Sequence, residues 1–190
     1  QKVGMVKDLY DSYASVRQLF EESDDALGFS LTKLCFEGPD EELMLTYNTQ
    51  PAILTASTAC NLVLKEEGFQ PDIVAGHSLG EYSALVAAGS LDFADAVRTV
   101  RLRGQFMQEA VPLGEGAMAA ILGLDEEKIK SICTQISTQG STVEAVNFNC
   151  PGQIVIAGAT KAVEQAVESM KEAGAKRAVM LNVSAPLAPA

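Results

Sequence analysis

A Gly-His-Ser-Leu-Gly run at residues 76–80 limits the possible folds of this chain more than any other feature. A short apolar stretch over 72–76, bounded by turn-forming residues, precedes it and predicts a buried parallel strand. A helical pattern over 80–88, ending at Gly89, follows it. A G-x-S-x-G between strand and helix is the context in which a serine serves as a nucleophile. We therefore expect an α/β fold with Ser78 on a sharp turn.

The spacing of the motif has a chemical reason, although a G-x-S-x-G can also occur by chance in a glycine-rich turn. Glycines at 76 and 80 would remove Cβ atoms where strand and helix crowd together. The backbone N–H of Leu79 would lie at a helix N-terminus, aimed at a developing oxyanion. His77 is the only histidine, but an adjacent residue in a tight turn points away from Ser78. We expect His77 to be a packed or hydrogen-bonding neighbour of the site.

The remaining pattern up to residue 114 predicts helices. The stretch 31–36 is a short helix or a turn, and the longer helices cover 4–25, 49–67 with Pro51 in the first turn, and 92–110 with Asp92 as N-cap. This last helix carries Arg98, Arg101 and Arg103. We expect the first two to pair with Asp92 or Asp95 on a solvated face, and Arg103 to share a face with Met107. A guanidinium at Arg103 suits two-point binding of a carboxylate, and the alternative is an ion pair with Glu109.

After residue 114 the hydrophobic pattern changes from mainly helical to alternating strands and helices. Pro112, Gly114 and Gly116 interrupt the pattern at this point. Strands are predicted over 117–122, 143–148, 153–157 and 177–183, and helices over 125–137 and 160–173. The order β-α-β-β-α-β is that of a split βαβ, ferredoxin-like domain. We therefore expect one domain over 1–114, a second over 115–185 and a tail over 186–190.

Composition excludes several classes of protein. The chain has 190 residues, 47% of them hydrophobic, with 14 Lys+Arg against 25 Asp+Glu and a net charge of −11. So acidic a chain is a poor nucleic-acid binder. No apolar run is long enough to span a membrane, and no signal-peptide core or initiator Met opens the chain, so we expect it to begin inside a longer product.

No feature of the sequence predicts a metal or a cofactor. Four cysteines without a C-x-x-C pair or a histidine cluster predict free, mostly buried thiols in a reducing cytoplasm. A G-x-G-x-x-A run at 114–119 does not follow a strand, so it does not predict a dinucleotide site.

Several longer stretches carry a resemblance that covers nearly the whole chain. The sequence resembles the bacterial malonyl-CoA–acyl carrier protein transacylases, the loading enzymes of fatty-acid synthesis. The matching stretches are 49–52 (TQPA), 75–85 (AGHSLGEYSAL), 92–97 (DFADAV), 103–111 (RGQFMQEAV), 116–124 (GAMAAILGL) and 146–158 (VNFNCPGQIVIAG).

The resemblance implies an α/β-hydrolase-like large subdomain, incomplete in this chain, with an inserted ferredoxin-like βαββαβ small subdomain. It implies that Ser78 is acylated, that Leu79 gives a backbone oxyanion donor and that Arg103 holds the free carboxylate of malonyl. Gln50 and Met107 match positions near the acyl pocket. The implied partners are malonyl-CoA and acyl carrier protein, without nucleic acid, membrane or cofactor, in the cytoplasm.

The chain departs from the family's pattern at both ends. It begins at about the last Gln of a G-Q-G-S-Q loop that gives a second oxyanion donor, and the family's histidine position falls on Ala188. We expect a trimmed and weakly active or inactive chain. Two alternatives stay open, a serine thioesterase or other hydrolase and a non-catalytic scaffold. If a carrier docks, we expect it on the least acidic part of the chain, at Lys161, Lys171, Lys176 and Arg177.

Overall fold

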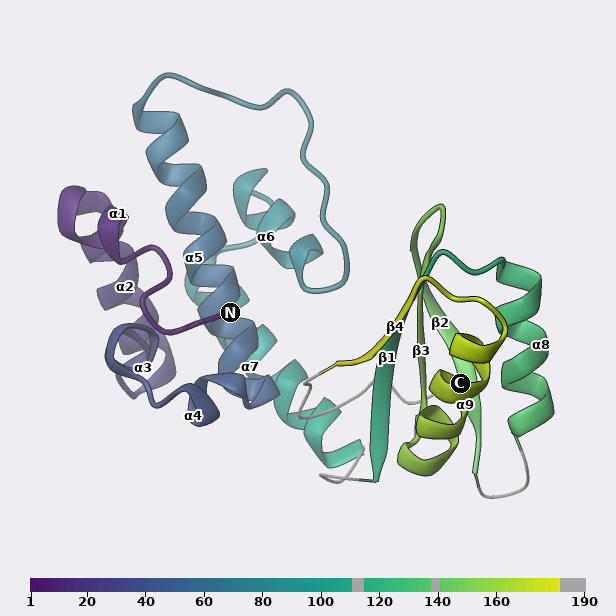
Figure 1. Cartoon of the computed structure of the whole chain (residues 1–190). Helices are drawn as coiled ribbons and strands as arrows, with labels where there is room; N and C mark the ends of the chain where they lie inside the picture. The colour runs from purple at the N-terminus through teal and green to yellow at the C-terminus, as the bar shows by residue number, and fades with distance from the viewer. Residues whose placement is uncertain (111–114, 138–140, 182–190) are drawn as a thin grey trace. The chain divides into compact units, whose positions relative to one another are not determined.

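The computed structural model describes residues 1–110, 115–137 and 141–181, and its contacts divide the chain into two compact units. The first unit is Gln1–Phe106 and the second is Met107–Ala190 (Figure 1). The boundary predicted near residue 114 and the predicted tail over 186–190, with Ala188, lie outside the described residues. Helices make up the first unit and a sheet with two helices the second, so the α/β class predicted from the sequence is confirmed.

The first unit has its own apolar core. Its helices, the last of which continues into the second unit, are α1 (Lys7–Ser12), α2 (Ala14–Leu27), α3 (Leu31–Glu37), α4 (Asp40–Met44), α5 (Thr46–Glu66), α6 (Gly80–Ala87) and α7 (Phe93–Ala110). Side chains from α2, α3, α5 and α7 meet in the core, with Phe20, Leu31, Leu54 and Val97 among the fully buried ones. Asp92 accepts a hydrogen bond from the backbone N–H of Asp95 at 3.2 Å and so caps α7, as predicted.

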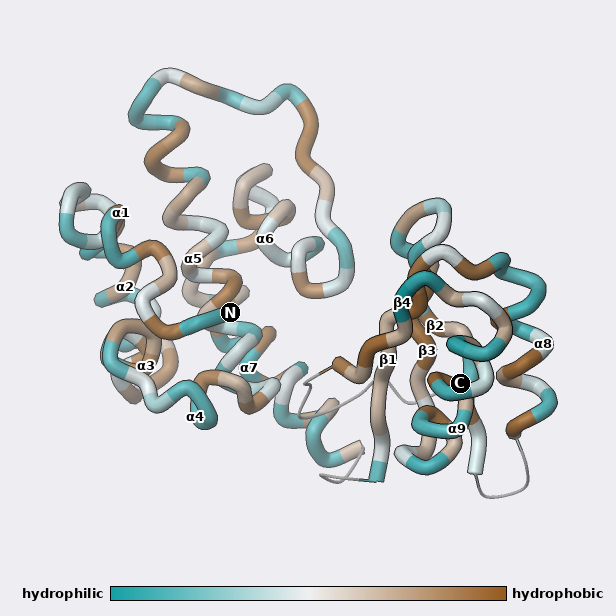
Figure 2. The backbone as a smooth tube through the Cα atoms, viewed as in Figure 1, coloured by the Kyte–Doolittle hydropathy of each residue, from teal (hydrophilic) through white to brown (hydrophobic). Residues whose placement is uncertain are grey.

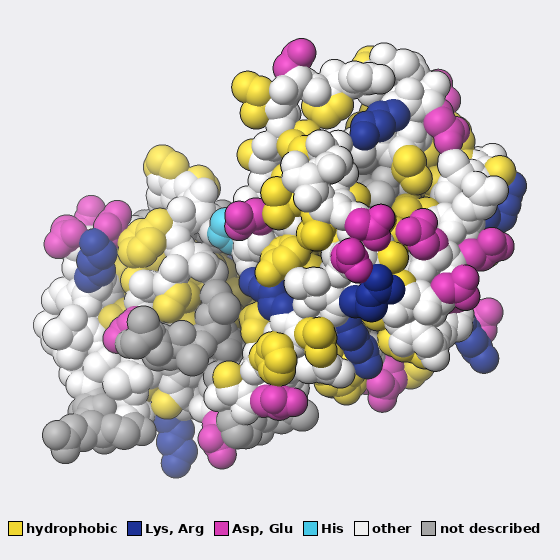
Figure 3. All heavy atoms as spheres, turned by 180° about the vertical axis from the view of Figure 1, so that it is seen from behind, with side chains coloured by type: hydrophobic (Ala, Val, Ile, Leu, Met, Phe, Trp, Pro, Cys, Tyr) yellow, Lys and Arg dark blue, Asp and Glu magenta, His cyan; other side chains and the backbone are white. Residues whose placement is uncertain are grey.

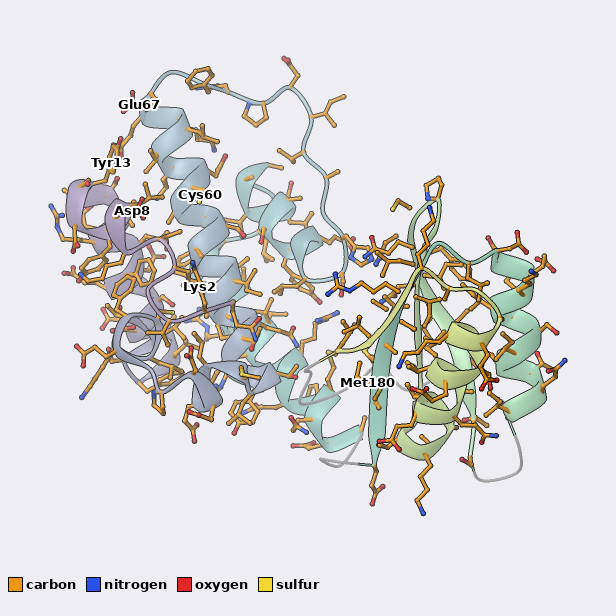
Figure 4. The ribbon with its side chains drawn as sticks, in the orientation of Figure 1. Lys2, Asp8, Tyr13, Cys60, Glu67 and Met180 are labelled. Carbon is orange, nitrogen blue, oxygen red and sulfur yellow. The ribbon has the colours of Figure 1, made fainter. Side chains whose placement is uncertain are left out.

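The helix predicted over 4–25 is interrupted. Tyr13 has extended backbone dihedrals and separates α1 from α2. Its hydroxyl donates a hydrogen bond to Glu67, just after the end of α5, at 3.2 Å, and Figure 4 shows the two side chains near each other. Apolar residues on both sides of the break contribute to the same core, which is why the periodicity did not reveal it. Helix α4 was not predicted, and α5 begins at Thr46, so that Pro51 lies inside it.

The strand predicted over 72–76 is wrong. The backbone of residues 70–76 forms no hydrogen bond with any part of the chain that the structure describes, and Ile73 is 88% exposed. Figure 1 shows this segment as a long loop between α5 and α6. A buried strand needs a neighbour on its hydrogen-bonding edge, and the four described strands all pair with one another in the second unit. An apolar sequence alone does not supply that neighbour.

The second unit contains an antiparallel sheet with two helices. Its elements are β1 (Gly116–Leu122), α8 (Glu126–Ile136), β2 (Val143–Cys150), β3 (Gln153–Ala159), α9 (Thr160–Glu172) and β4 (Arg177–Met180). This order is the one predicted. The strands lie in the order β2-β3-β1-β4, and every pair is antiparallel, with Ala119 opposite both Ile156 and Met180.

Alternation along the strands builds the core of this unit. Ala119, Ile121, Ile154 and Ile156 lie in one cluster with the apolar faces of α8 and α9, while Met118, Ala120, Val155 and Ala157 form a separate cluster. Figure 2 shows mostly apolar colouring along β1 and β3, and alternating apolar and polar colouring along α8 and α9. Among the described residues, no helix combines the length and the hydropathy that crossing a membrane requires.

Candidate active site

The turn that carries Ser78 has the strained geometry that the motif predicts. Ser78 has a φ of 53°, in the left-handed region, which a serine adopts at a cost of roughly 1–3 kcal/mol. A Cβ at Gly76 would overlap the backbone of Gly80 and Glu81, so only glycine fits at 76. The same prediction is wrong for Gly80, because a Cβ there would enter open space. The close approach is thus made by one glycine of the motif.

The backbone after Ser78 turns directly into α6. The N–H of Gly80 donates to the carbonyl of His77 at 2.9 Å, and that of Glu81 donates to the carbonyl of Ser78 at 3.2 Å. Leu79 is the N-cap residue of this helix. Its own N–H donates no hydrogen bond within the described residues, so it remains available to an acceptor at the positive end of the helix.

Arg103 joins the serine to a buried amide. Its Nη2 donates to Ser78 Oγ at 3.1 Å, and its Nη1 donates to Gln50 Oε1 at 2.6 Å. Gln50 is only 4% exposed. The guanidinium also lies over the ring of Tyr82, with 5.9 Å to the ring centroid. Three residues from α5, α7 and the turn before α6, all selected from the sequence, therefore meet at one point.

No acidic side chain in the described part of the chain neutralises the charge of Arg103. No Asp or Glu of residues 1–110, 115–137 and 141–181 forms an ion pair with it, so the alternative pairing with Glu109 is not observed. A half-buried guanidinium next to a nucleophile, held by neutral groups, is suited to receive an anion. The chemistry of the site is therefore that of a serine facing a negatively charged group.

The other two arginines of α7 behave differently from each other. Arg98 pairs with Asp95 at 2.6 Å, as predicted. The same prediction is wrong for Arg101, which donates to the carbonyl of Tyr47 at 2.9 Å and to Asn48 Oδ1. It lies over the rings of Phe29 and Tyr47, and burial lowers its pKa from the usual arginine value. Helical spacing could not reveal this contact, because Tyr47 is distant in the sequence.

His77 is the one histidine of the chain, and it lies apart from the contacts of Arg103. His77 is exposed, and its ring forms no hydrogen bond to a described residue, so the expectation of a packed or hydrogen-bonded neighbour is wrong. The reason is that residues 71–78 are mostly uncovered by other elements (Figure 3 shows the histidine, in cyan, at the surface). Met107 follows Arg103 in α7 but falls in the second unit, and its place near an acyl pocket stays a prediction.

Tyr82 was missed by the sequence reasoning. It lies one turn after Ser78 in α6, and this i, i+4 spacing was the available signal. Neither a metal nor a cofactor is expected at this site from its residues. No group of three or more potential metal ligands occurs in the described part of the chain.

The four residues predicted to dock a carrier lie on exposed parts of the second unit. Lys161 lies in the first turn of α9 and Lys171 in its last turn, Lys176 precedes β4, and Arg177 begins that strand. Lys171 is paired with Glu168 at 2.7 Å, and the other three have no ion pair to a described acid. The side-chain carbons of Lys176 pack beside Gly123, where a Cβ would approach within 2.6 Å.

Comparison with known proteins shows which proteins the chain resembles. A family model described as "Acyl transferase domain" matches residues 1–186. The malonyl CoA-acyl carrier protein transacylases of Bacillus subtilis (strain 168) and Escherichia coli (strain K12) are 58% and 56% identical to the chain. Each match covers 98% of this chain but only 59% and 60% of the relative, so the chain spans about 60% of their length.

Solved structures give the same picture. The malonyl CoA-acyl carrier protein transacylase of Coxiella burnetii is 45% identical with a TM-score of 0.93, covering 98% of this chain and 59% of its own. A malonyl-transacylase solved in complex with its type II PKS acyl-carrier protein is 53% identical with a TM-score of 0.92, covering 98% and 60%. The likeness extends over both compact units of the chain.

Proposed function

This chain belongs to the acyl transferase domain family, and from that membership we propose that its protein transfers malonyl from malonyl-CoA to the phosphopantetheine thiol of an acyl carrier protein, in fatty-acid biosynthesis. One observation carries the proposal. Arg103, without a carboxylate partner among the described residues, donates to the hydroxyl of Ser78 at 3.1 Å. A guanidinium in that place can hold the free carboxylate of a malonyl thioester while the serine attacks its carbonyl.

In the first half of the proposed reaction, Ser78 Oγ attacks the thioester carbonyl of malonyl-CoA. The C–O bond of the malonyl ester forms, the C–S bond breaks, and CoA leaves as a thiol carrying the proton that the hydroxyl gives up. The negative charge that develops on the carbonyl oxygen needs a donor in place before the reaction. The N–H of Leu79 is the proposed donor, since it makes no other hydrogen bond within the described chain.

In the second half, the thiol of the phosphopantetheine arm attacks the malonyl ester. The C–S bond forms, the C–O bond breaks, and the proton of the thiol returns to Ser78 Oγ. All the groups named are protein or substrate groups, so the proposed reaction needs no cofactor or metal. The carrier is proposed to dock on Lys161, Lys171, Lys176 and Arg177, because carrier proteins are acidic and these side chains are exposed.

The finer architecture and the location are part of the same proposal. The strand order β2-β3-β1-β4 supports a ferredoxin-like small subdomain over 115–185, and the G-x-S-x-G turn before α6 supports an α/β-hydrolase-like subdomain over 1–114. A cytoplasmic location is proposed because all four cysteines are free thiols.

Arg103→Ala tests the function. We expect malonyl transfer to fall by about 2–5 kcal/mol in kcat/KM, the range for removing one partner of a buried charged pair, with a much smaller loss for acetyl. Arg103→Lys should recover only part, because a point charge cannot form the planar fork. The measurement is competition between malonyl-CoA and acetyl-CoA, followed as acylation of the peptide that contains Ser78.

Arg98→Ala is the matched control, since it removes a guanidinium of the same helix that is already paired with Asp95. An unchanged malonyl-over-acetyl ratio in Arg103→Ala would remove Arg103 from the site. Release of free malonate at the same rate with and without carrier would instead identify a hydrolase.

A further inference from the structure

A proline inside α5 leaves one backbone carbonyl without its helical partner. Pro51 is the sixth residue of the helix, which begins at Thr46. In an α-helix the N–H of residue 51 would donate to the carbonyl of Tyr47, four residues earlier, but proline has no N–H. A carbonyl that loses this bond needs another donor, because an unsatisfied backbone group costs free energy when it is kept from water.

Arg101 supplies that donor from α7. Its Nη1 donates to the Tyr47 carbonyl at 2.9 Å and also to Asn48 Oδ1. Asn48 is 5% exposed and donates in turn to the carbonyl of Glu42 at 2.7 Å. The guanidinium is fixed in place by two rings, with centroids 4.9 Å away for Phe29 and 4.6 Å for Tyr47. The Arg101 side chain therefore supplies the hydrogen bond that is missing from the first turns of α5.

The same turns of α5 carry a residue of the candidate active site. Gln50, next to Pro51, accepts a hydrogen bond at 2.6 Å from Arg103, two residues after Arg101 in α7. Between these contacts the two helices are as close as their backbones allow. A Cβ on Gly104 would lie 2.5 Å from Tyr47 Cα and 2.9 Å from the Thr46 carbonyl oxygen.

We propose that Arg101 is a positioning residue for the acyl site: it replaces the hydrogen bond that Pro51 removes, and so sets the turn from which Gln50 holds Arg103 against Ser78. This inference rests on the proposed function. It assigns the three arginines of α7 three different tasks, a surface ion pair for Arg98, support of α5 for Arg101 and the acyl carboxylate for Arg103. The contact of Arg101 is thus part of the selectivity for a charged acyl group.

The experiment replaces Arg101 with methionine, which keeps most of the volume and removes the donors. Acylation of Ser78 by malonyl-CoA and by acetyl-CoA is measured in competition, together with the melting temperature. We expect the malonyl-over-acetyl ratio to fall by about tenfold, less than the roughly hundredfold cost of a 1 Å misplacement at a reacting group. Arg101→Lys should give a smaller fall, and the control Arg98→Met should give none.

A second substitution separates positioning from a general loss of stability. Pro51→Ala restores an N–H that can donate to the Tyr47 carbonyl. When it is combined with Arg101→Met, the malonyl-over-acetyl ratio should therefore return most of the way to the parent value. The ratio is compared at a temperature where every variant is folded, and Arg101→Lys takes the place of Arg101→Met if the latter does not fold.

The outcomes divide clearly. A ratio that falls in Arg101→Met and recovers with Pro51→Ala supports the proposal. A ratio that stays at the parent value, or equal losses for both thioesters, overturns it, because Arg101 would then act on stability alone. A fall that Pro51→Ala does not reverse also overturns it, because the Tyr47 carbonyl would not be the group that matters. All variants are made in the full-length protein that contains this chain, and failure of that parent protein to acylate Ser78 at all would count against the proposed function instead.

Discussion

The two glycines of the 76–80 turn occupy different environments although the motif treats them alike. Gly76 approaches the backbone of Gly80 and Glu81 so closely that no side chain fits, whereas Gly80 faces open space at the start of α6. The close packing at Gly76 holds Ser78 in its left-handed conformation. The geometry of the nucleophile therefore depends on a residue that has no side chain.

We expect Gly76→Ala to destabilise the protein by about 1–3 kcal/mol, the usual cost of forcing extra atoms into a packed place, and to abolish acylation of Ser78. Gly80→Ala should change the free energy of unfolding by less than about 0.5 kcal/mol or increase it slightly, since alanine is the better helix former. Denaturant unfolding and mass spectrometry of the acylated peptide check the pair. Equal effects of the two substitutions would contradict the assigned geometry.

The buried thiol of Cys35 makes the free energy of unfolding depend on pH. Burial, with a smaller contribution from Asp24, raises the pKa of Cys35 from 9.0 to about 12. Below pH 9 the thiol is protonated in both states and its contribution to stability is complete. Above pH 9 it ionises only in the unfolded chain, so the free energy of unfolding falls as pH rises toward about 12.

Replacing Cys35 with alanine should therefore make the loss of stability between pH 8 and pH 10.5 less steep than in the parent. Cys150→Ala is the control, because it removes an exposed cysteine of the other unit. Denaturant unfolding at a series of pH values measures both. A parent-like slope in Cys35→Ala would mean that other groups cause the loss.

Helices and strands could be predicted from the sequence where their ends are determined by neighbouring residues. In the second unit the helices and strands lie within a few residues of their predicted ends. Their ends depend on local features, namely the alternation of apolar and polar residues, helix caps such as Asp125 and turns such as 150–152. The elements that were mispredicted depend on distant partners. The break at Tyr13 is accompanied by a bond to Glu67, and α5 tolerates Pro51 with the help of Arg101.

The residues of the candidate site also differ in whether local sequence could predict them. The turn at Ser78 and the predicted donor at Leu79 follow from five consecutive residues. Arg103 was singled out by the chemistry of its guanidinium, whereas the selection of Gln50 depended on the family resemblance. Their contact joins α5 to α7, which no periodicity could place. The strand over 72–76 failed for a related reason, because pairing is a property of two segments and the sequence pattern describes one.

The last helix and strand allow a test of carrier docking. Lys176→Glu should slow transfer to the carrier more than Lys171→Glu does, because Lys171 is already paired with Glu168 while Lys176 has no ion pair to a described acid. A change of several-fold is expected for exposed charges, and it should diminish as salt is added. Loading of Ser78 by malonyl-CoA should be unaffected in both variants. Equal effects on loading and transfer, or none on either, would place docking elsewhere.

At the scale of the whole molecule, the two units differ in how many of their extended backbone segments form hydrogen bonds. Strands β1 and β3 lie in the middle of the sheet with partners on both sides, whereas residues 70–76 form no hydrogen bond to the described chain. Backbone amides without partners exchange with solvent at rates near those of an unfolded peptide. The backbone amides of the segment just before the nucleophile are therefore not protected by any described residue.

Hydrogen–deuterium exchange of this chain should accordingly show fast exchange over 70–76 and slow exchange over 117–121 and 154–158. The sheet strands act as the internal control in the same sample. Protection of 70–76 comparable to that of β1 would mean that the segment pairs with another strand in solution.

The distribution of the cysteines has a practical consequence. Each compact unit contains one buried thiol and one exposed thiol: Cys35 and Cys60 in the first, Cys133 and Cys150 in the second. Burial raises the pKa of Cys133 to about 11, and that of Cys35 to about 12, so both are poor nucleophiles near neutral pH. Partial burial also raises the pKa of Cys60, but Cys60 and Cys150 are exposed, so a maleimide dye added under native conditions would attach at Cys60, labelled in Figure 4, and at Cys150. The natural sequence thus carries a donor and an acceptor position for energy-transfer measurements, one on each unit, without any engineered cysteine.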